Sequence, residues 1–203
     1  MYHFTIPMAV MNFIPTLFFG AAALLLQKDL HNKLTRGAYT LFAAGTINIF
    51  TAGFLKSTWK LLYAAGLCDF QVLATMFLPV QSVGFLLAGV GIALMLTKKK
   101  TLMAAVAPPV FSGSVVFIMM MVLGLGSICT VLSIIAVKMK KKSAMLLFIL
   151  AFVASMGMGA MSGADFTQAW ANGAEQIINS IGQGCLLGGV LILHKAGLKE
   201  YIM

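Results

Sequence analysis

Residues 165–193, DFTQAWANGAEQIINSIGQGCLLGGVLIL, decide the fold because a long apolar segment carries a single row of polar side chains. The row follows spacings of three or four residues, which at about 100° per residue stack on one helical face. We name this row the polar stripe: Asp165, Gln168, Asn172, Glu175, Asn179 and Gln183. The pattern predicts a membrane helix whose polar face points into the protein or toward water.

The composition of the whole chain agrees with a membrane protein. Of its 203 residues 61% are hydrophobic and only 9% are charged, and the mean hydropathy is +0.99. Soluble domains are about one quarter charged. The apolar segments have the length of about 20 residues that a helix needs to cross ~30 Å of hydrocarbon, and no alternating pattern of a β-barrel occurs. We predict an all-α integral membrane protein, a multi-pass protein of the cell membrane, with residues 1–203 in a single transmembrane domain.

The positive charge indicates contact with lipids. The net charge is +9, and lysines gather at the ends of apolar segments, at 98–100 and 138–142. Such clusters bind lipid headgroups, so we expect membrane lipids and no nucleic acid as partners. The three cysteines and three histidines show no ligand spacing, and no nucleotide or catalytic motif is present. The sequence therefore predicts no metal, cofactor or catalytic residue, and favours a protein that is not an enzyme.

Six spans fit the apolar segments, at about 6–26, 38–55, 70–97, 109–137, 143–162 and 167–193. Pro15 predicts a kink or break in the first span, and Pro79 lies inside the third. Residues 61–67 are too few to cross alone, and they either extend the second span or form a re-entrant turn.

An internal repeat relates the two halves of the chain. Gly84, Leu86, Leu87, Gly89, Val90 and Ile92 recur as Gly184, Leu186, Leu187, Gly189, Val190 and Ile192. We predict units 1–100 and 101–203 with three spans each, and an odd number of spans makes the second unit inverted. Seven spans with parallel repeats are the less favoured alternative, because the segment between the two lysine clusters is too short for two crossings and a turn.

The expected depth of each residue in the membrane divides the polar stripe into an interfacial group and a deep group. Asp165, Gln168 and Asn172 are expected at the membrane interface, whereas Glu175, Asn179 and Gln183 lie deep. A carboxylate in hydrocarbon costs several kcal/mol unless it is paired, protonated or hydrated. For the two amides the alternative is structural, since hydrogen bonds between membrane helices contribute ~0.6 kcal/mol each.

Polar residues next to prolines extend the candidate site. Gln81 follows Pro79, and Asn12 precedes Pro15, so both lie where a membrane helix is interrupted. Interrupted helices often form transport sites. Lys56 and Lys60 are expected to snorkel to the interface, because a pair with Glu175 requires a long or broken second helix.

Trp59 and Trp170 are expected as interfacial anchors. The candidate substrate-binding residues are Glu175, Asn179, Gln183, Gln81 and Asn12.

These residues favour a small transporter or channel for a polar small solute or cation. The first alternative is a ligand-binding or partner-binding membrane subunit or receptor. A lipid-modifying enzyme is less favoured, because Asp165 and Glu175 lie roughly 15 Å apart along a helix and cannot act as a pair. A homodimer or a complex with a membrane partner subunit is compatible with the sequence.

Overall fold

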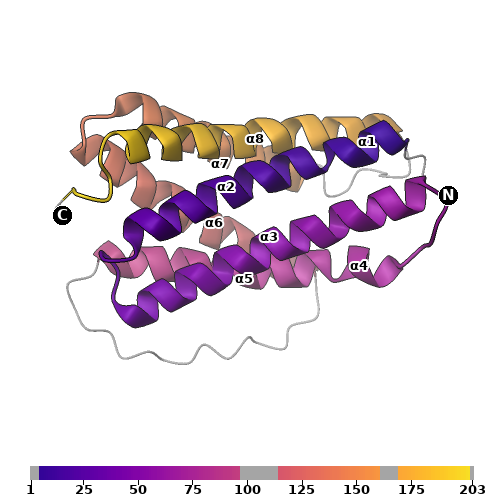
Figure 1. Cartoon of the computed structure of the whole chain (residues 1–203), viewed down its shortest axis with the longest axis horizontal. Coiled ribbons are helices and arrows are strands. Elements are labelled where there is room, and N and C mark those ends of the chain that lie inside the picture. Colours follow the sequence, from indigo (N-terminus) through magenta and orange to yellow (C-terminus); the bar gives the residue numbers. More distant parts are fainter. Residues whose placement is uncertain (1–4, 97–113, 161–168, 202–203) are drawn as a thin grey trace.

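The computed structural model describes residues 5–96, 114–160 and 169–201, and in these ranges the chain forms helices and no strand (Figure 1). The first half contains α1 (Ile6–Met11), α2 (Phe13–Leu30), α3 (Arg36–Ala64), α4 (Gln71–Thr75), α5 (Phe77–Ala93) and the 3-10 turn η1 (Leu94–Leu96). The second half contains α6 (Ser114–Lys138), α7 (Lys142–Ala160) and α8 (Ala169–Lys195).

The helices match the predicted spans in place and in apolar character. Within the described residues, five stretches are long and apolar enough to cross a membrane: Ile6–Leu30, Arg36–Ala64, Gln71–Leu96, Val115–Lys138 and Trp170–Lys195. The fifth predicted span is a shorter apolar helix, Lys142–Met158. The prediction of an all-helical membrane-spanning protein is therefore confirmed.

Pro15 and Pro79 each lie three residues after an interruption of a helix. Asn12 separates α1 from α2 ahead of Pro15, and Met76 separates α4 from α5 ahead of Pro79. Proline has no N–H group and its ring clashes with the preceding turn, so the helical ladder cannot continue. The carbonyl of Asn12 is instead bonded by Ser57 Oγ of α3, at 3.1 Å. The predicted break near Pro15 is confirmed.

The six long helices form a ring in the order α2, α3, α5, α6, α7, α8 and back to α2 (Figure 1). In each half, the second and third helices share the most extensive contact, α3 with α5 and α7 with α8. The third helix of each half then packs against the first helix of the other half, α5 against α6 and α8 against α2. The two halves are thus arranged alike around the ring.

Contacts between α2 and α8 fix the direction of one half relative to the other. Gln176 Nε2 of α8 donates to the carbonyl of Met8, at 3.0 Å. Near the other end of both helices, His194 Nδ1 lies 2.9 Å from Asp29 Oδ2. Helix α8 is therefore parallel to α1 and α2.

The remaining helices alternate within each half. Short turns at 31–35 and 139–141 make α3 antiparallel to α2 and α7 antiparallel to α6. The Cβ position of Gly84 lies beside Ile49, and that of Gly91 beside Phe42, so α5 is antiparallel to α3. Gly189 meets Phe148 and Gly157 meets Ile178, so α8 is antiparallel to α7.

Corresponding helices of the two halves consequently run in the same direction. The predicted inverted topology is not what the structure shows; the orientation is that of the parallel alternative. Helix α5 ends at one end of the ring, and α6 begins at the other. The segment 97–113 that joins them lies outside the described residues. The sequence predicted an inverted second half because each unit was counted as three spans. The contacts of α8 with α2 instead require that the two halves run in the same direction.

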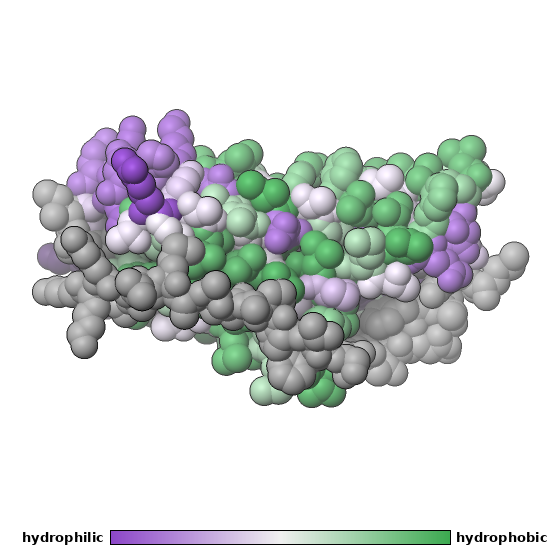
Figure 2. Space-filling view, turned by 90° about the horizontal axis from the view of Figure 1, so that it is seen from below, coloured by the Kyte–Doolittle hydropathy of each residue, from purple (hydrophilic) through white to green (hydrophobic). Residues whose placement is uncertain are grey.

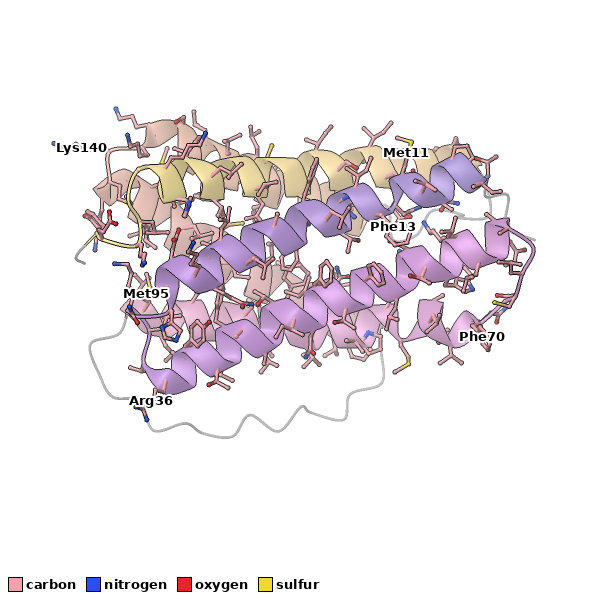
Figure 3. All side chains as sticks on the ribbon, in the orientation of Figure 1. Met11, Phe13, Arg36, Phe70, Met95 and Lys140 are labelled. Carbon is pink, nitrogen blue, oxygen red and sulfur yellow. The ribbon has the colours of Figure 1, made fainter. Side chains whose placement is uncertain are left out.

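The two ends of the ring differ in charge. One end, which we call the basic end, carries the exposed or half-exposed cations Lys28, Lys33, Arg36, Lys138, Lys140, Lys141, Lys142, Lys195 and Lys199. Hydrophilic residues gather at this left-hand end in Figure 2. Figure 3 shows Arg36, Met95 and Lys140 at the basic end and Phe70 at the opposite end.

Packing is tightest in the half of the ring next to the basic end. The largest fully buried apolar side chains include Leu30, Phe42, Leu132, Phe148 and Leu193, all close to the ends of helices that lie there. No such cluster occurs in the opposite half among the described residues, where the helices enclose a cavity.

Candidate functional site

The cavity inside the ring has a volume of about 400 Å³ and is bounded by all six long helices. All of its lining residues are buried or half-buried. It extends from mid-bundle to within roughly 10 Å of the end opposite the basic end, by the rise of 1.5 Å per helical residue. Its polar lining side chains are Asn12, Thr16, Lys56, Ser57, Gln81, Ser155, Glu175, Asn179 and Gln183.

All five residues that the sequence indicated as a site line this cavity. Glu175, Asn179 and Gln183 reach it from α8, Gln81 from α5, and Asn12 from the break between α1 and α2. The spacing of the polar stripe gave the correct face of α8. Convergence of Gln81 and Asn12 on the same cavity depends on the ring arrangement, which the sequence did not show.

The rest of the polar stripe is placed differently. Asn172 is 1% exposed and was expected at the interface, so that expectation is wrong. It lies buried because its side chain binds Lys60 of α3. Asp165 and Gln168 lie outside the described residues.

Glu175 accepts hydrogen bonds from two lysines of α3. Its Oε1 lies 2.9 Å from Lys56 Nζ, and its Oε2 lies 3.4 Å from Lys60 Nζ. The ammonium of Lys60 also lies 3.3 Å from Asn12 Oδ1 and 3.3 Å from Asn172 Oδ1. Three acceptors around one nitrogen match the three donors of an ammonium ion.

The prediction that Lys56 and Lys60 snorkel is therefore wrong. The Lys60 side chain is only 3% exposed, and that of Lys56 is 24% exposed. The reason is the length of α3, which continues through 61–64 and forms no re-entrant turn. Both lysines thereby lie one to two turns inside the bundle, level with Glu175 on α8.

The two tryptophans also differ from each other. Trp59 is 4% exposed, and its Nε1 donates to Asp69 Oδ1 at 3.0 Å, so it is not the predicted interfacial anchor. Trp170 is 65% exposed near the start of α8, a position in accord with an anchor.

Two of the side chains that line the cavity have a buried amide oxygen without a hydrogen-bond partner among the described residues: Gln81 Oε1 and Gln183 Oε1. The amide nitrogen of Gln183 donates to Asn179 Oδ1 of the same helix, at 3.5 Å. In contrast, Gln176 joins two helices through Met8. A buried unpartnered polar atom is costly, so these two amides are the least satisfied polar groups of the cavity wall.

Most of the remaining cavity wall is apolar. Phe19, Phe50, Phe85, Met121 and Leu125 form its sides, on four different helices. The cavity thus combines charged and amide side chains with aromatic and aliphatic ones. This mixture is typical of sites for small organic molecules.

A second concavity, of about 560 Å³, lies between α6 and α7. Its lining includes the exposed residues Thr130, Val137 and Ile149, so it opens on the outer surface of the bundle. Lys138 is its only charged lining residue, and nothing in it resembles a reactive site. Across the described ranges, no group of three potential metal ligands occurs.

No protein-family model matches the sequence, and neither a curated protein nor a solved structure does. The geometry itself establishes that this chain forms a membrane-type helical bundle whose internal cavity is lined by charged and amide side chains.

Proposed function

We propose that the protein is a small multi-pass transporter of the cell membrane that binds a small polar solute in the cavity of the ring. The observation that carries the proposal is the convergence of Glu175, Asn179, Gln183, Gln81 and Asn12 on one internal cavity. A bundle that only needed to be stable in lipid would fill this volume with apolar side chains, because buried polar groups without partners cost free energy.

The symmetry of the ring supports transport. Two halves of like direction surround the cavity, and α5 with α6 and α8 with α2 form the contacts between them. Parallel repeats around a central site can rock against each other and expose that site to either side in turn. The tightly packed half next to the basic end closes the cavity on that side in this conformation.

The test measures whether a cysteine placed in the cavity reacts with an aqueous thiol reagent added to either side of the membrane. Ser155 lines the cavity and is replaced by cysteine in a chain whose Cys68, Cys129 and Cys185 are changed to alanine. A membrane-impermeant cationic thiol reagent, trimethylammonioethyl methanethiosulfonate, is added to right-side-out and to inside-out vesicles. We expect Ser155→Cys to react in both preparations, because a transporter exposes its site to both sides.

Val153→Cys is the matched control. It lies on the same helix, two residues away, and its side chain is 58% exposed on the outside of the bundle, where lipid would cover it. It should react in neither preparation. If Ser155→Cys is equally unreactive from both sides, the cavity is not hydrated and the proposed function is wrong.

The second candidate is a ligand-binding membrane subunit, which the sealed half of the ring favours. Such a protein needs one opening only. Reaction of Ser155→Cys from a single side, unchanged over long incubation, would favour this candidate and contradict transport.

A further inference from the structure

A groove runs along the outside of the ring between α6 and α7, where the second concavity described above lies. On α6 it is lined at spacings of one and three residues, from Gly126 at one end to Lys138 at the other, so it follows one face of that helix. The helical rise from Lys138 to Gly126 is about 18 Å. A bilayer has ~30 Å of hydrocarbon, so the groove extends through about one leaflet, beginning at the basic end.

The walls of the groove suit a hydrocarbon chain. Phe148 and Phe152 line it from α7, and Cys129 and Ile134 are among the residues that line it from α6. At its deep end the Cβ position of Gly126 lies 3.3 Å from the ring of Phe152, so the two helices approach each other closely there. The groove is therefore a mostly apolar slot that narrows toward the middle of the membrane.

The shallow end of the groove is strongly basic. Lys138 lines it, and Lys140, Lys141 and Lys142 follow where the chain turns from α6 into α7; all four are exposed. The sequence contains no Asp or Glu between residues 70 and 164, and within the described part of the chain none of these lysines forms an ion pair. An anionic group that reaches this end meets four cations and no competing carboxylate of α6 or α7.

Hydrogen bonds fix the turn that carries these lysines. The backbone N–H of Lys140 donates to the carbonyl of Val137 at 2.9 Å, and that of Lys141 donates to the carbonyl of Ala136 at 2.8 Å. Lys140 has a φ of 58°, a left-handed conformation that glycine adopts at less cost. The turn thus carries a positive charge at a position where the backbone favours glycine.

The corresponding turn of the first half, between α2 and α3, is different. Its Lys33 donates to the carbonyl of Tyr201, and the buried carboxylate of Asp29 lies one helical turn before it on α2. The chain itself therefore engages this lysine. The lysines of 138–142 instead remain exposed beside an apolar groove.

We propose that the groove binds one anionic phospholipid of the leaflet at the basic end, with an acyl chain along α6 and α7 and the headgroup phosphate at Lys138. Basic pockets between membrane helices bind anionic headgroups, because lysine supplies both a positive charge and hydrogen-bond donors. A free anion would leave the apolar groove empty, and a lipid without net charge would leave the lysines unneutralised. The site is separate from the cavity of the ring, so it does not depend on whether that cavity binds a solute.

The first test compares two lipids with the same acyl chains by native mass spectrometry of the protein in detergent micelles. Dioleoylphosphatidylglycerol has a net negative charge, and dioleoylphosphatidylcholine has none. With both lipids added in equal amounts, we expect the first bound molecule to be predominantly phosphatidylglycerol. Lys138→Gln should raise the dissociation constant of phosphatidylglycerol about five-fold, the usual effect of one basic residue near anionic headgroups. Lys138→Arg should leave it nearly unchanged.

Lys199→Gln is the matched lysine control, because it removes one exposed positive charge at the basic end from outside the groove. It should leave the affinity for phosphatidylglycerol unchanged. An equal loss of affinity in Lys138→Gln and Lys199→Gln would show that net charge, and not the groove, selects the lipid. Equal occupancy by the two lipids in the unaltered protein would also overturn the proposal.

The second test asks whether the groove holds the acyl chain. Thr130 is exposed and lines the groove, so Thr130→Trp places an indole in the path of the chain and should weaken the binding of phosphatidylglycerol several-fold. Leu123→Trp is the control, since this exposed residue lies two helical turns deeper on the same face of α6, beyond the groove. Equal affinities of the two variants would contradict a chain in the groove. Thermal unfolding without added lipid verifies that both variants are folded.

Glycerol 3-phosphate separates a lipid site from a phosphate site. It carries the phosphate without an acyl chain, and in large excess it should not displace phosphatidylglycerol. Displacement would show that the lysines bind a free phosphate without the groove, and would overturn the assignment of a lipid.

Discussion

At the scale of single residues, Glu175 is the group whose removal is most consequential. Glu175→Gln removes the carboxylate that Lys56 and Lys60 share in a low-dielectric interior. Breaking a buried ion pair by removing one partner costs about 3–5 kcal/mol. We expect a loss of unfolding free energy of that order, measured by denaturation in mixed micelles.

Two further variants separate charge imbalance from a simple loss of packing. Adding Lys60→Met to Glu175→Gln removes one of the two ammonium groups that Glu175 binds in the native protein. Part of the lost stability should therefore return. Glu200→Gln, at an exposed position, should have no measurable effect. A double variant that is no more stable than Glu175→Gln would contradict the ion cluster as the cause.

The pair of Asp29 and His194 should respond unequally to truncation. The Asp29 side chain is 0% exposed, whereas that of His194 is 35% exposed and can reach water. His194→Leu leaves a buried carboxylate without its partner, while Asp29→Leu leaves an imidazole that water can bond. We expect His194→Leu to lower the thermal unfolding temperature more than Asp29→Leu does. The reverse order would contradict this account of the pair.

The sequence predicts individual residues only where local spacing determines them. The face of α8 that carries Glu175, Asn179 and Gln183 follows from helical periodicity alone. The roles of Lys56 and Lys60 do not, because their partner lies across the ring and pairing depends on how far α3 continues. Their spacing of four residues on one face was the available signal.

At the scale of helices, the contact between α5 and α6 depends on glycine. A Cβ on Gly124 would lie 2.2 Å from the carbonyl oxygen of Phe85, which is backbone and cannot turn aside. Gly124→Ala should therefore separate the two helices and cost about 1–3 kcal/mol, as overpacked interiors do. Thermal unfolding in detergent measures the effect.

Gly173 offers the matched control on α8. Apart from its own stretch of helix, no heavy atom of the described residues lies within 4 Å of its Cβ position. Gly173→Ala should be neutral or stabilising by up to about 1 kcal/mol, because alanine has the higher helix propensity. If both substitutions destabilise equally, the close approach of α5 and α6 is not the cause.

Helix positions were predictable because apolar length is a strong local signal. The breaks were predictable for the same reason, since proline acts within its own helix. Helix α3 was the exception: the polar residues Lys56, Ser57 and Lys60 interrupt its apolar pattern, although they face the interior and the helix continues to Ala64.

At the scale of the whole molecule, parallel halves predict that corresponding turns of the two halves lie on the same side of the membrane. Asn32 follows the first span and Ser143 begins the fifth, and both are exposed at the basic end. Single cysteines at these two positions should react with an impermeant thiol reagent from the same side of the membrane. By the positive-inside rule we expect that side to be the cytoplasm.

Leu67→Cys, exposed at the opposite end of the ring, is the control that must react from the other side. Labelling of Asn32→Cys and Ser143→Cys from opposite sides would restore the inverted topology and contradict the ring described above.

The relative direction of the halves could not be read from the chain. The predicted repeat, based on matches such as Gly84 with Gly184, carries no information on whether its two units share a direction. That direction is fixed by contacts between α2 and α8, whose residues are more than 160 positions apart.

The depth of the cavity links its occupancy to membrane voltage. A unit charge that crosses the whole membrane exchanges ~2.3 kcal/mol per 100 mV with the electric field. If the basic end faces the cytoplasm, a charged solute that enters the cavity from outside traverses up to about half of that field. An inside-negative potential then opposes the binding of a monovalent anion, and favours that of a monovalent cation, by at most about 1 kcal/mol per 100 mV. An energised membrane would therefore change the binding of either from outside several-fold, and depolarisation would reverse the change.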